Sequence, residues 1–459
     1  MLDPILNTCC AARRARLSGL IGAIPALIPA GSARPRNYLA NTFPFRASSH
    51  FLYLVGLPLE GAGLWLDAGR AVLLLRPDDP DDALWHGARP SSAEVGAQLG
   101  LEVARWDDLP MLRGGRDVAT LPPFDWNERH TLAGVVARDA ASLGEAAHDA
   151  PLRDALIALR LVQDAGALGE LRRAAAVTVD AHRAGMRATR AGVREHVVCA
   201  AMEQVVGGAG CTTAYPSIVS VHGEVLHNHH HGNLLEEGQL MLADVGAESA
   251  LGYASDVTRT WPVSGTFSGS QRAIYELVLA MQHAAIEKVA PGVRYRDVHL
   301  AAARTLVDGL VQLGVLAGEV DALVEDGVHA LFFPHGVGHL LGLDVHDMED
   351  LGDHAGYAPG RVRSTQFGLA YLRLDRDLAP GMLVTIEPGF YQVPSLLGDP
   401  ARVGLSARAL DRSKLAAYAD VRGIRIEDDV LVTDTGNEVL TRALAKEPGE
   451  VEALVGSVH

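Results

Sequence analysis

Four strand-like apolar runs in the second half of the chain carry carboxylates, and these acids constrain the fold more than any other feature. The runs read "QLMLADVG", "GYASDVTRTWP", "MLVTIEPGFY" and "GIRIEDDVLVT". Asp244 and Asp256 are expected to lie inside otherwise apolar strands, so that Asp256, for example, shares one face with Ala254 and Thr258. Glu387 follows the apolar run "MLVTI", and Glu427 is expected on one face of a strand together with Arg425 and Asp429. Because burying an unpaired carboxylate costs several kcal/mol, the acids require compensation.

Two divalent cations would supply that compensation for Asp244, Asp256, Glu387 and Glu427. Four carboxylates balance the charge of two such ions, and one imidazole adds a neutral ligand. An oxygen-rich site with a single histidine favours Mn(II), Co(II) or Fe(II), although Zn(II) is not excluded. Any one of these acids alone is more simply a helix cap or an exposed strand residue. The set, taken with a nearby histidine segment, favours a metal site.

That histidine segment is "PHGVGHLLGLDVHD", residues 334–347. It contains His335, His339 and His346, and Gly336 and Gly338 stand in the interval where a zinc-protease helix of the type H-E-x-x-H would carry its glutamate. Glycines at both places argue against a stable helix. If the segment contributes to a metal site, the other ligands must therefore come from elsewhere in the chain.

The bulk composition indicates a globular protein with two or three domains, since the 459 residues are 48% hydrophobic and 21% charged. A formal charge of -16 argues against a nucleic-acid or anionic-membrane partner. The cysteines are few and irregularly spaced, which favours a reducing cytoplasm. Arginines 13, 14 and 16 and the apolar stretch after them imitate a secretory signal, but Pro25 and Pro29 interrupt that stretch. We expect no membrane span.

The pattern of elements predicts two domains. Residues 1–150 alternate short apolar runs with Pro, Asp and Gly, which is typical of a smaller α/β domain with a mixed sheet. Residues 128–195 read as helices that contain the connection. Helical stretches at 268–289 and 295–314 separate the acid-bearing strands, so the C-terminal half is predicted to be α+β.

The motifs "DVG…YASDVTRTWPVSG", "PHGVGHLLGLDVHD", "TIEPGFY" and "GIRIEDDVLVT" resemble, in order and type, the signature blocks of the proline-specific pita-bread metallopeptidases, aminopeptidase P and prolidase. The similarity covers roughly residues 165–445, which implies a pita-bread catalytic domain at 165–450. The stretch "RNYLANTFPFRASSHFLYLVG" also resembles the N-terminal domain of these enzymes, which is assigned to residues 1–150.

The resemblance implies that two metal ions, manganese foremost, are held by five residues, of which Asp256 and Glu427 bridge both ions. The five are Asp244, Asp256, His339, Glu387 and Glu427. The dozen or so positions between the two aspartates fit adjacent hairpin strands. A hydroxide that bridges the metals would be the nucleophile.

The resemblance also assigns roles around the metals. His346 would stabilise the tetrahedral intermediate, His335 would contact the prolyl side, and Glu387 would shuttle a proton. Further substrate or support groups would be His227, Arg373, Tyr391 and Arg425. For the neighbouring residues 229–231, all histidines, a solvated loop or an adventitious metal binder is the simpler interpretation.

Two activities remain open within the same chemistry. The first is an Xaa-Pro aminopeptidase that acts on peptides with proline in the second position, and the second is a prolidase, which cleaves only Xaa-Pro dipeptides. About forty positions separate Asp347 from Glu387 and Glu387 from Glu427. These spacings are closer to those of the longer prolidases than to those of compact aminopeptidases P. Arg373 matches their carboxylate-binding arginine, or is a surface arginine before a turn.

A metal-free binding module and a creatinase-like hydrolase are disfavoured, because none of the five ligands is missing. The resemblance further implies a homodimer.

Overall fold

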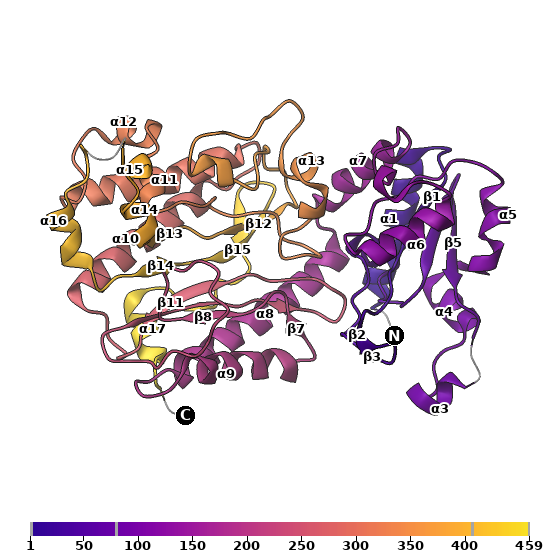
Figure 1. Cartoon of the computed structure of the whole chain (residues 1–459), viewed down its shortest axis with the longest axis horizontal. Helices are drawn as coiled ribbons and strands as arrows, with labels where there is room; N and C mark the ends of the chain where they lie inside the picture. Colours follow the sequence, from indigo (N-terminus) through magenta and orange to yellow (C-terminus); the bar gives the residue numbers. More distant parts are fainter. Residues whose placement is uncertain (1–2, 79–80, 405–407, 458–459) are drawn as a thin grey trace. The chain divides into compact units, whose positions relative to one another are not determined.

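The computed structural model describes residues 3–78, 81–404 and 408–457, and the chain divides into two compact units, Met1–Leu168 and Gly169–His459 (Figure 1). The N-terminal unit contains a four-stranded sheet in the order β1-β4-β5-β6, in which only the β5–β6 pair is parallel. The predicted mixed sheet of an α/β unit is therefore confirmed. Its elements are α1 (Pro4–Ile21), β1 (Ala26–Pro29), β2 (Pro35–Tyr38), β3 (Asn41–Thr42), α2 (Ser49–Val55), β4 (Gly63–Asp67), β5 (Arg70–Leu75), α3 (Asp82–His86), α4 (Ser92–Leu99), β6 (Glu102–Arg105), α5 (Leu109–Arg113), α6 (Trp126–Val136) and α7 (Asp149–Arg160).

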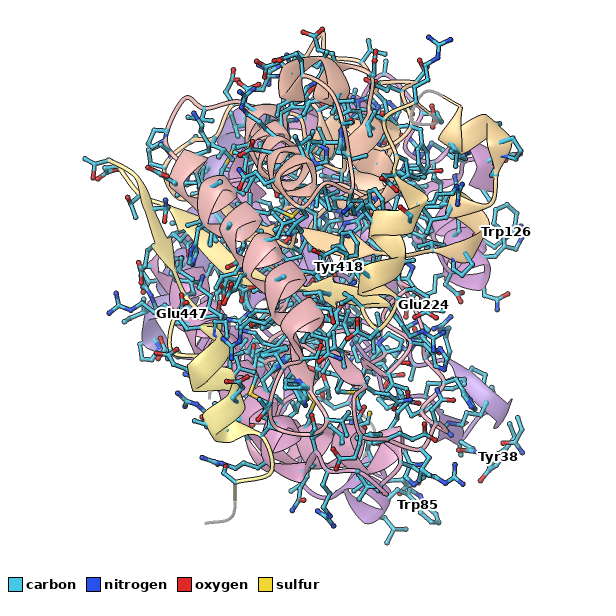
Figure 2. All side chains as sticks on the ribbon, turned by 90° about the vertical axis from the view of Figure 1, so that its left-hand side faces the viewer. Tyr38, Trp85, Trp126, Glu224, Tyr418 and Glu447 are labelled. Carbon is cyan, nitrogen blue, oxygen red and sulfur yellow. The ribbon has the colours of Figure 1, made fainter. Side chains whose placement is uncertain are left out.

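The stretch that imitates a secretory signal is folded into this unit as helix α1 and strand β1. Asp3 caps α1, and its carboxylate accepts hydrogen bonds from the N–H groups of Ile5 and Leu6. Arg13 is buried and forms an ion pair of 2.7 Å with Asp164. Several aromatic side chains of the unit are instead exposed at its surface, among them Tyr38, Trp85 and Trp126 (Figure 2).

The C-terminal unit is α+β, as predicted, and contains two three-stranded antiparallel sheets, β11-β9-β8 and β12-β15-β16, with shorter pairs beside them. In Figure 1 these strands lie between α10 and α11 on one side and α9 on the other. Helix α8 (Ala165–Ala188) leads into the unit. The remaining elements are α9 (Glu195–Gly208), β7 (Thr212–Thr213), β8 (Ile218–Ser220), β9 (Leu240–Asp244), β10 (Ala247–Glu248), β11 (Thr258–Pro262), α10 (Gly269–Lys288), α11 (Tyr295–Gln312), α12 (Val320–Glu325), α13 (Asp353–Gly356), β12 (Leu383–Ile386), β13 (Gly389–Tyr391), α14 (Pro394–Leu397), α15 (Pro400–Val403), α16 (Arg412–Leu415), β14 (Gly423–Arg425), β15 (Asp428–Val432), β16 (Asn437–Val439) and α17 (Pro448–Leu454).

Helices α10 and α11 form where the sequence predicted them and pack against each other. Ser268 starts α10 with a capping box, in which its hydroxyl accepts the N–H of Gln271 while the Gln271 side chain accepts the N–H of Ser268. A Cβ at Gly309 on α11 would lie 2.3 Å from Leu277 on α10. Glycine at this position therefore permits the close approach of the two helices.

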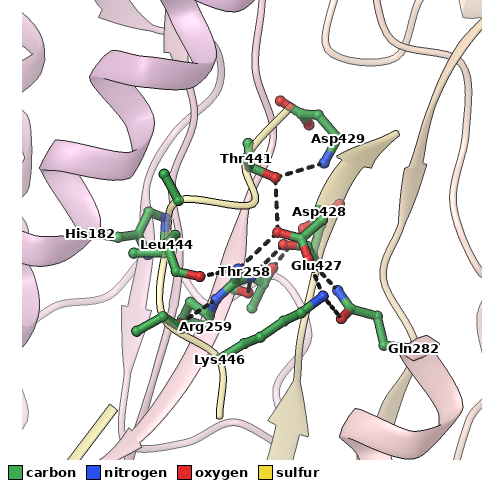
Figure 3. A network of polar contacts seen from close by, with 12 residues as sticks. His182, Thr258, Arg259, Gln282, Glu427, Asp428, Asp429, Thr441, Leu444 and Lys446 are labelled. Atoms are coloured by element: carbon green, nitrogen blue, oxygen red, sulfur yellow. Dashed lines mark hydrogen bonds and ion pairs between the residues drawn. The ribbon is translucent and has the colours of Figure 1, made fainter. Parts of the chain in front are cut away.

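A buried ion cluster ties β11 to β15 at the centre of the C-terminal unit (Figure 3). The guanidinium of Arg259 on β11 lies 2.8 Å from a carboxylate oxygen of Asp428 on β15, and both side chains are fully buried. Lys446 lies 2.9 Å from the other carboxylate oxygen. Burial alone would raise the pKa of Asp428, but the charges of Arg259 and Lys446 hold it well below its ordinary value. Arg259 also donates to the main-chain carbonyl oxygens of Thr258 and Glu427, so the cluster fixes the backbone of β11 and of the residue just before β15.

The sulfur atoms of the cysteines are not joined in disulfides, in line with the sequence. Within the described part of the chain, none of the helices combines the length and the apolar character that a membrane crossing needs.

Removal of the charge of Asp428 should destabilise the C-terminal unit strongly. In Asp428→Asn, Arg259 keeps its buried charge but loses its anionic partner, and we expect the free energy of unfolding to fall by about 3–5 kcal/mol. Urea denaturation followed by circular dichroism measures this. The matched control is Glu438→Gln, which removes an exposed ion pair with Arg172 and should cost less than about 1 kcal/mol. Equal losses in the two variants would contradict the assigned role of the cluster.

Candidate metal centre

The acids singled out in the sequence converge in the C-terminal unit, but two of them lie outside the strands in which they were expected. Asp244 ends β9, whereas Asp256 precedes β11, Glu387 follows β12 and Glu427 lies between β14 and β15. The expectation of a position inside a strand was therefore wrong for Asp256 and Glu427.

The backbone hydrogen bonds explain these interruptions. The N–H of Asp256 donates to the carboxylate of Asp429, at 3.1 Å, and the N–H of Glu387 donates to the carbonyl oxygen of Val337, at 2.7 Å. The N–H of Glu427 donates to the carbonyl oxygen of Thr258. Each N–H thus finds a partner outside the regular ladder of its own sheet, so the chain can turn the acid toward a common point without an unsatisfied backbone group.

Asp256, His339 and Glu427 form the centre of this arrangement. One potential ligand atom from each lies within 4.8 Å of the other two, and all three residues are buried. The Nε2 atom of His339 lies 3.3 Å from a carboxylate oxygen of Asp256 and 3.7 Å from one of Glu387. Thr258 donates its hydroxyl to Glu427 at 2.7 Å, which holds that carboxylate in place.

Asp244 joins the group through Tyr215 and Arg425. The Tyr215 hydroxyl lies 2.6 Å from an oxygen of Asp244 and 2.5 Å from an oxygen of Asp256. Because a hydroxyl carries one proton, it can donate to only one of the two acids at a time. Arg425 donates to the other oxygen of Asp244 at 2.5 Å. The four acids and the histidine expected to hold metal are therefore brought together.

His339 is oriented as a metal ligand would be. Its Nδ1 lies 2.9 Å from the carbonyl oxygen of Leu340, which can only accept, so Nδ1 carries the proton and the lone pair of a neutral ring is on Nε2, toward the acids. The backbone before it passes close to β12, since a Cβ at Gly338 would lie 2.1 Å from the carbonyl oxygen of Thr385. The absence of a helix from residues 334–347 confirms the expectation drawn from the two glycines.

The electrostatics of the cluster reflect an excess of negative charge. Burial, followed by the charges of neighbouring acids, raises the pKa of Glu427 well above its usual value. Burial likewise raises the pKa of Glu387 to about 7. Burial would lower the pKa of His339, but Asp256 and Glu387 raise it to about 9. These acids hold a proton on a buried histidine, and an oxygen-rich group of this charge fits divalent cations.

A cavity of about 790 Å³ opens onto the cluster. Five side chains expected to meet substrate or support the site line it, namely His227, His335, His346, Arg373 and Arg425. His229 also lines it, whereas Nε2 of His231 lies 3.0 Å from the carbonyl oxygen of Ser217.

Tyr391 differs from the other substrate candidates because it is fully buried and is not among the residues that line the cavity. Its hydroxyl accepts from Arg425 at 3.0 Å and lies 2.9 Å from Nε2 of His335. The Nδ1 atom of His335 bonds the carbonyl oxygen of Gly336, so Nε2 is free to accept the phenolic proton. Burial, then the charge of Arg425, lowers the pKa of His335 to about 3, which keeps this ring neutral. Tyr391 thus orients His335 without itself lining the cavity.

Two residues at this site were missed in the sequence. Tyr215 lies in "TTAYPSIV", where a tyrosine before a proline has no feature that separates it from a packed aromatic. Glu349 lines the cavity and contacts Arg373 at 2.6 Å. Its position three residues after His346 was a signal that could have identified Glu349 as a candidate. Its contact with Arg373, however, could not be predicted from the sequence.

Comparisons with known proteins agree with this geometry. The model of metallopeptidase family M24 matches residues 169–434, and the model of the aminopeptidase P N-terminal domain matches residues 10–111. A probable Xaa-Pro aminopeptidase of Verticillium alfalfae is 32% identical over 90% of this chain and 88% of its own length. The Xaa-Pro dipeptidase of Homo sapiens is 31% identical over 92% of this chain and 87% of its own.

Solved structures are similar over nearly the whole chain. The aminopeptidase PepP of Pseudomonas aeruginosa superposes with a TM-score of 0.80 at 32% identity, covering 98% of each chain. Aminopeptidase P of Escherichia coli in complex with substrate gives the same TM-score at 29% identity. The predicted architecture, a pita-bread domain with a separate N-terminal domain, is confirmed.

The hydroxyl of Tyr215 should support metal binding. In Tyr215→Phe, Asp244 and Asp256 lose their shared hydrogen-bond donor, and we expect the affinity for Mn²⁺ to fall by about tenfold or more. Isothermal titration calorimetry measures this. Tyr418→Phe, a change on the short helix Ala416–Tyr418, serves as the control and should leave the affinity unchanged. An unaltered affinity in Tyr215→Phe would show that the phenol does not orient these acids.

Proposed function

Because the chain belongs to metallopeptidase family M24, as its motifs indicated, we propose that it is an Xaa-Pro aminopeptidase with a dinuclear metal centre. It would remove the N-terminal residue from peptides with proline in the second position. The observation that carries the proposal is the convergence of four carboxylates and one histidine at a cavity large enough for a peptide.

Five residues would hold the metal ions, and Asp256 and Glu427 would be shared between the two. The set consists of Asp244, Asp256, His339, Glu387 and Glu427. Their oxygen-rich character favours Mn²⁺, with Co²⁺, Zn²⁺ or Fe²⁺ as alternatives. When bound, two such cations supply a nucleophile from water at neutral pH and polarise the carbonyl of the bond to be cleaved.

The protein's own residues would then bind the peptide and move protons. Glu387 accepts a proton from the attacking water and returns it to the proline nitrogen as the C–N bond breaks, so that the products are an amino acid and a peptide with a free secondary amine. His346 donates a hydrogen bond to the oxygen that becomes negative, and the neutral His335 contacts the prolyl side. His227 and Arg425 support the substrate, and Tyr391 positions His335. An Xaa-Pro amide has no N–H, so the site needs no acceptor for one.

A prolidase activity is the second candidate, and the position of Arg373 favours it. The guanidinium of Arg373 lines the cavity, where it could bind the terminal carboxylate of a dipeptide. Relatives at about the same identity are named for each activity. A homodimer and a cytoplasmic location are part of the same proposal.

The role of Asp256 is tested with Ala-Pro-Ala and Ala-Pro as substrates in Mn²⁺. In Asp256→Asn, one negative charge is lost at the centre of the cluster, and we expect kcat/KM for Ala-Pro-Ala to fall at least about a hundredfold, with an unchanged circular dichroism spectrum. A chelator should abolish the activity of the unmodified enzyme. Asp180→Asn, on the exposed surface of α8, is the control.

Full activity of Asp256→Asn, or activity that survives the chelator, would contradict the metal-centred proposal. Hydrolysis of Ala-Pro without hydrolysis of Ala-Pro-Ala would replace the aminopeptidase by a prolidase.

A further inference from the structure

Arg373 does not face the cavity as a free cation. Its Nη1 lies 2.6 Å from Oε2 of Glu349, a charge-assisted hydrogen bond between two side chains that both line the cavity. The exposed fractions of the two side chains are similar, 38% and 37%. Solvent screening therefore reduces the strength of the pair, but a ligand that enters the cavity meets both charges together.

The other arginines of the cavity are paired in the same way. Among the described residues that line it, the guanidinium groups belong to Arg363, Arg373 and Arg425. Arg425 is bound to Asp244, and Arg363 is bound to Asp353 at 2.5 Å. A peptide carboxylate placed against any of these arginines would thus approach an acid as well.

The backbone holds Glu349 in this position. Met348, the residue before it, is buried and has a φ of 60°, a left-handed conformation that is uncommon for a residue with a side chain. Such conformations persist where the surrounding structure enforces them, often at functional sites. The same carboxylate oxygen of Glu349 lies 3.5 Å from Nδ1 of His346. Glu349 is therefore fixed between the substrate-facing histidine and Arg373.

We propose that Glu349 is a specificity determinant that neutralises Arg373 and selects against a free carboxylate on the proline of the substrate. In an Xaa-Pro dipeptide that carboxylate would meet the negative charge of Glu349 at Arg373, whereas in a longer peptide the same position is a neutral amide. The proposal rests on the proposed function and narrows it to peptides that continue beyond proline. Apolar side chains of the same cavity, including Phe367, Tyr371 and Leu396, provide contact surface for the following residues.

The test compares Ala-Pro with Ala-Pro-NH₂, which differ in the charge of the proline carboxyl group. The Mn²⁺-loaded enzyme should hydrolyse the amide with the higher kcat/KM. In Glu349→Gln the side chain keeps its size and an acceptor oxygen but loses its charge, and we expect the amide-to-acid ratio of kcat/KM to fall at least about fivefold. Any effect on His346 acts on both substrates and cancels in the ratio.

Two further variants locate the effect. In Arg373→Gln, Glu349 keeps its negative charge but loses the cation beside it, so the amide-to-acid ratio of kcat/KM should rise above that of the unmodified enzyme. Asp353→Asn removes another acid of the cavity, the partner of Arg363, and should leave the ratio unchanged.

An unchanged ratio in Glu349→Gln would overturn the proposal, as would an equal fall in Asp353→Asn or a fall of the ratio in Arg373→Gln. If the unmodified enzyme hydrolyses neither compound, the proposed function itself fails, and that outcome is separate from an unchanged ratio.

Discussion

The mutual repulsion of four largely buried carboxylates is the constraint on which the rest of this structure depends. Asp244, Asp256, Glu387 and Glu427 come from separate segments of the chain and lie around one point, where burial and like charge raise the pKa of three of them. The protein itself supplies partial compensation through Arg425, which donates to Asp244, and through His339 beside Asp256. A group of acids arranged in this way favours the binding of cations over its own metal-free form.

The strands that carry these acids are held together by a second, charge-balanced cluster. Arg259 and Asp428 are buried side by side, and Arg259 donates to the carbonyl oxygens of Thr258 and Glu427. Thr258 and Glu427 are joined again at the candidate metal centre, where the Thr258 hydroxyl donates to the Glu427 carboxylate. The ion cluster therefore sets the separation of β11 and the turn before β15, and with it the position of a candidate metal ligand. Such preorganisation is what allows a fixed ligand set to be present before a metal binds.

Much of the site could be predicted from the sequence because its chemistry is unusual there. Acids within apolar runs and histidines separated by glycine are conspicuous, and their resemblance to a known family indicated a candidate ligand set before any geometry was known. The exact placement of Asp256 and Glu427 beside strands could not be predicted, because it depends on hydrogen bonds to residues distant in the chain, Asp429 and Thr258. The alternation of side chains along a strand predicts which face of the sheet a residue occupies only as long as the strand stays hydrogen-bonded to its neighbour.

The residues that adjust the site were the least predictable. Tyr215 and Glu349 act through contacts that only the folded chain creates, the first across two aspartates and the second across the cavity to Arg373. Arg373 itself was recognised in the sequence as a candidate binding residue for a substrate carboxylate. Its ion pair with Glu349 argues against that role. A guanidinium that alone would attract a carboxylate is accompanied by an acid that repels one.

Anomalous X-ray scattering from crystals grown with Mn²⁺ tests the central claim most directly. We expect two manganese peaks within bonding distance of the carboxylates of Asp256 and Glu427, with His339 on one of the ions. A single peak, or peaks away from these side chains, would contradict a dinuclear centre built from the converging acids.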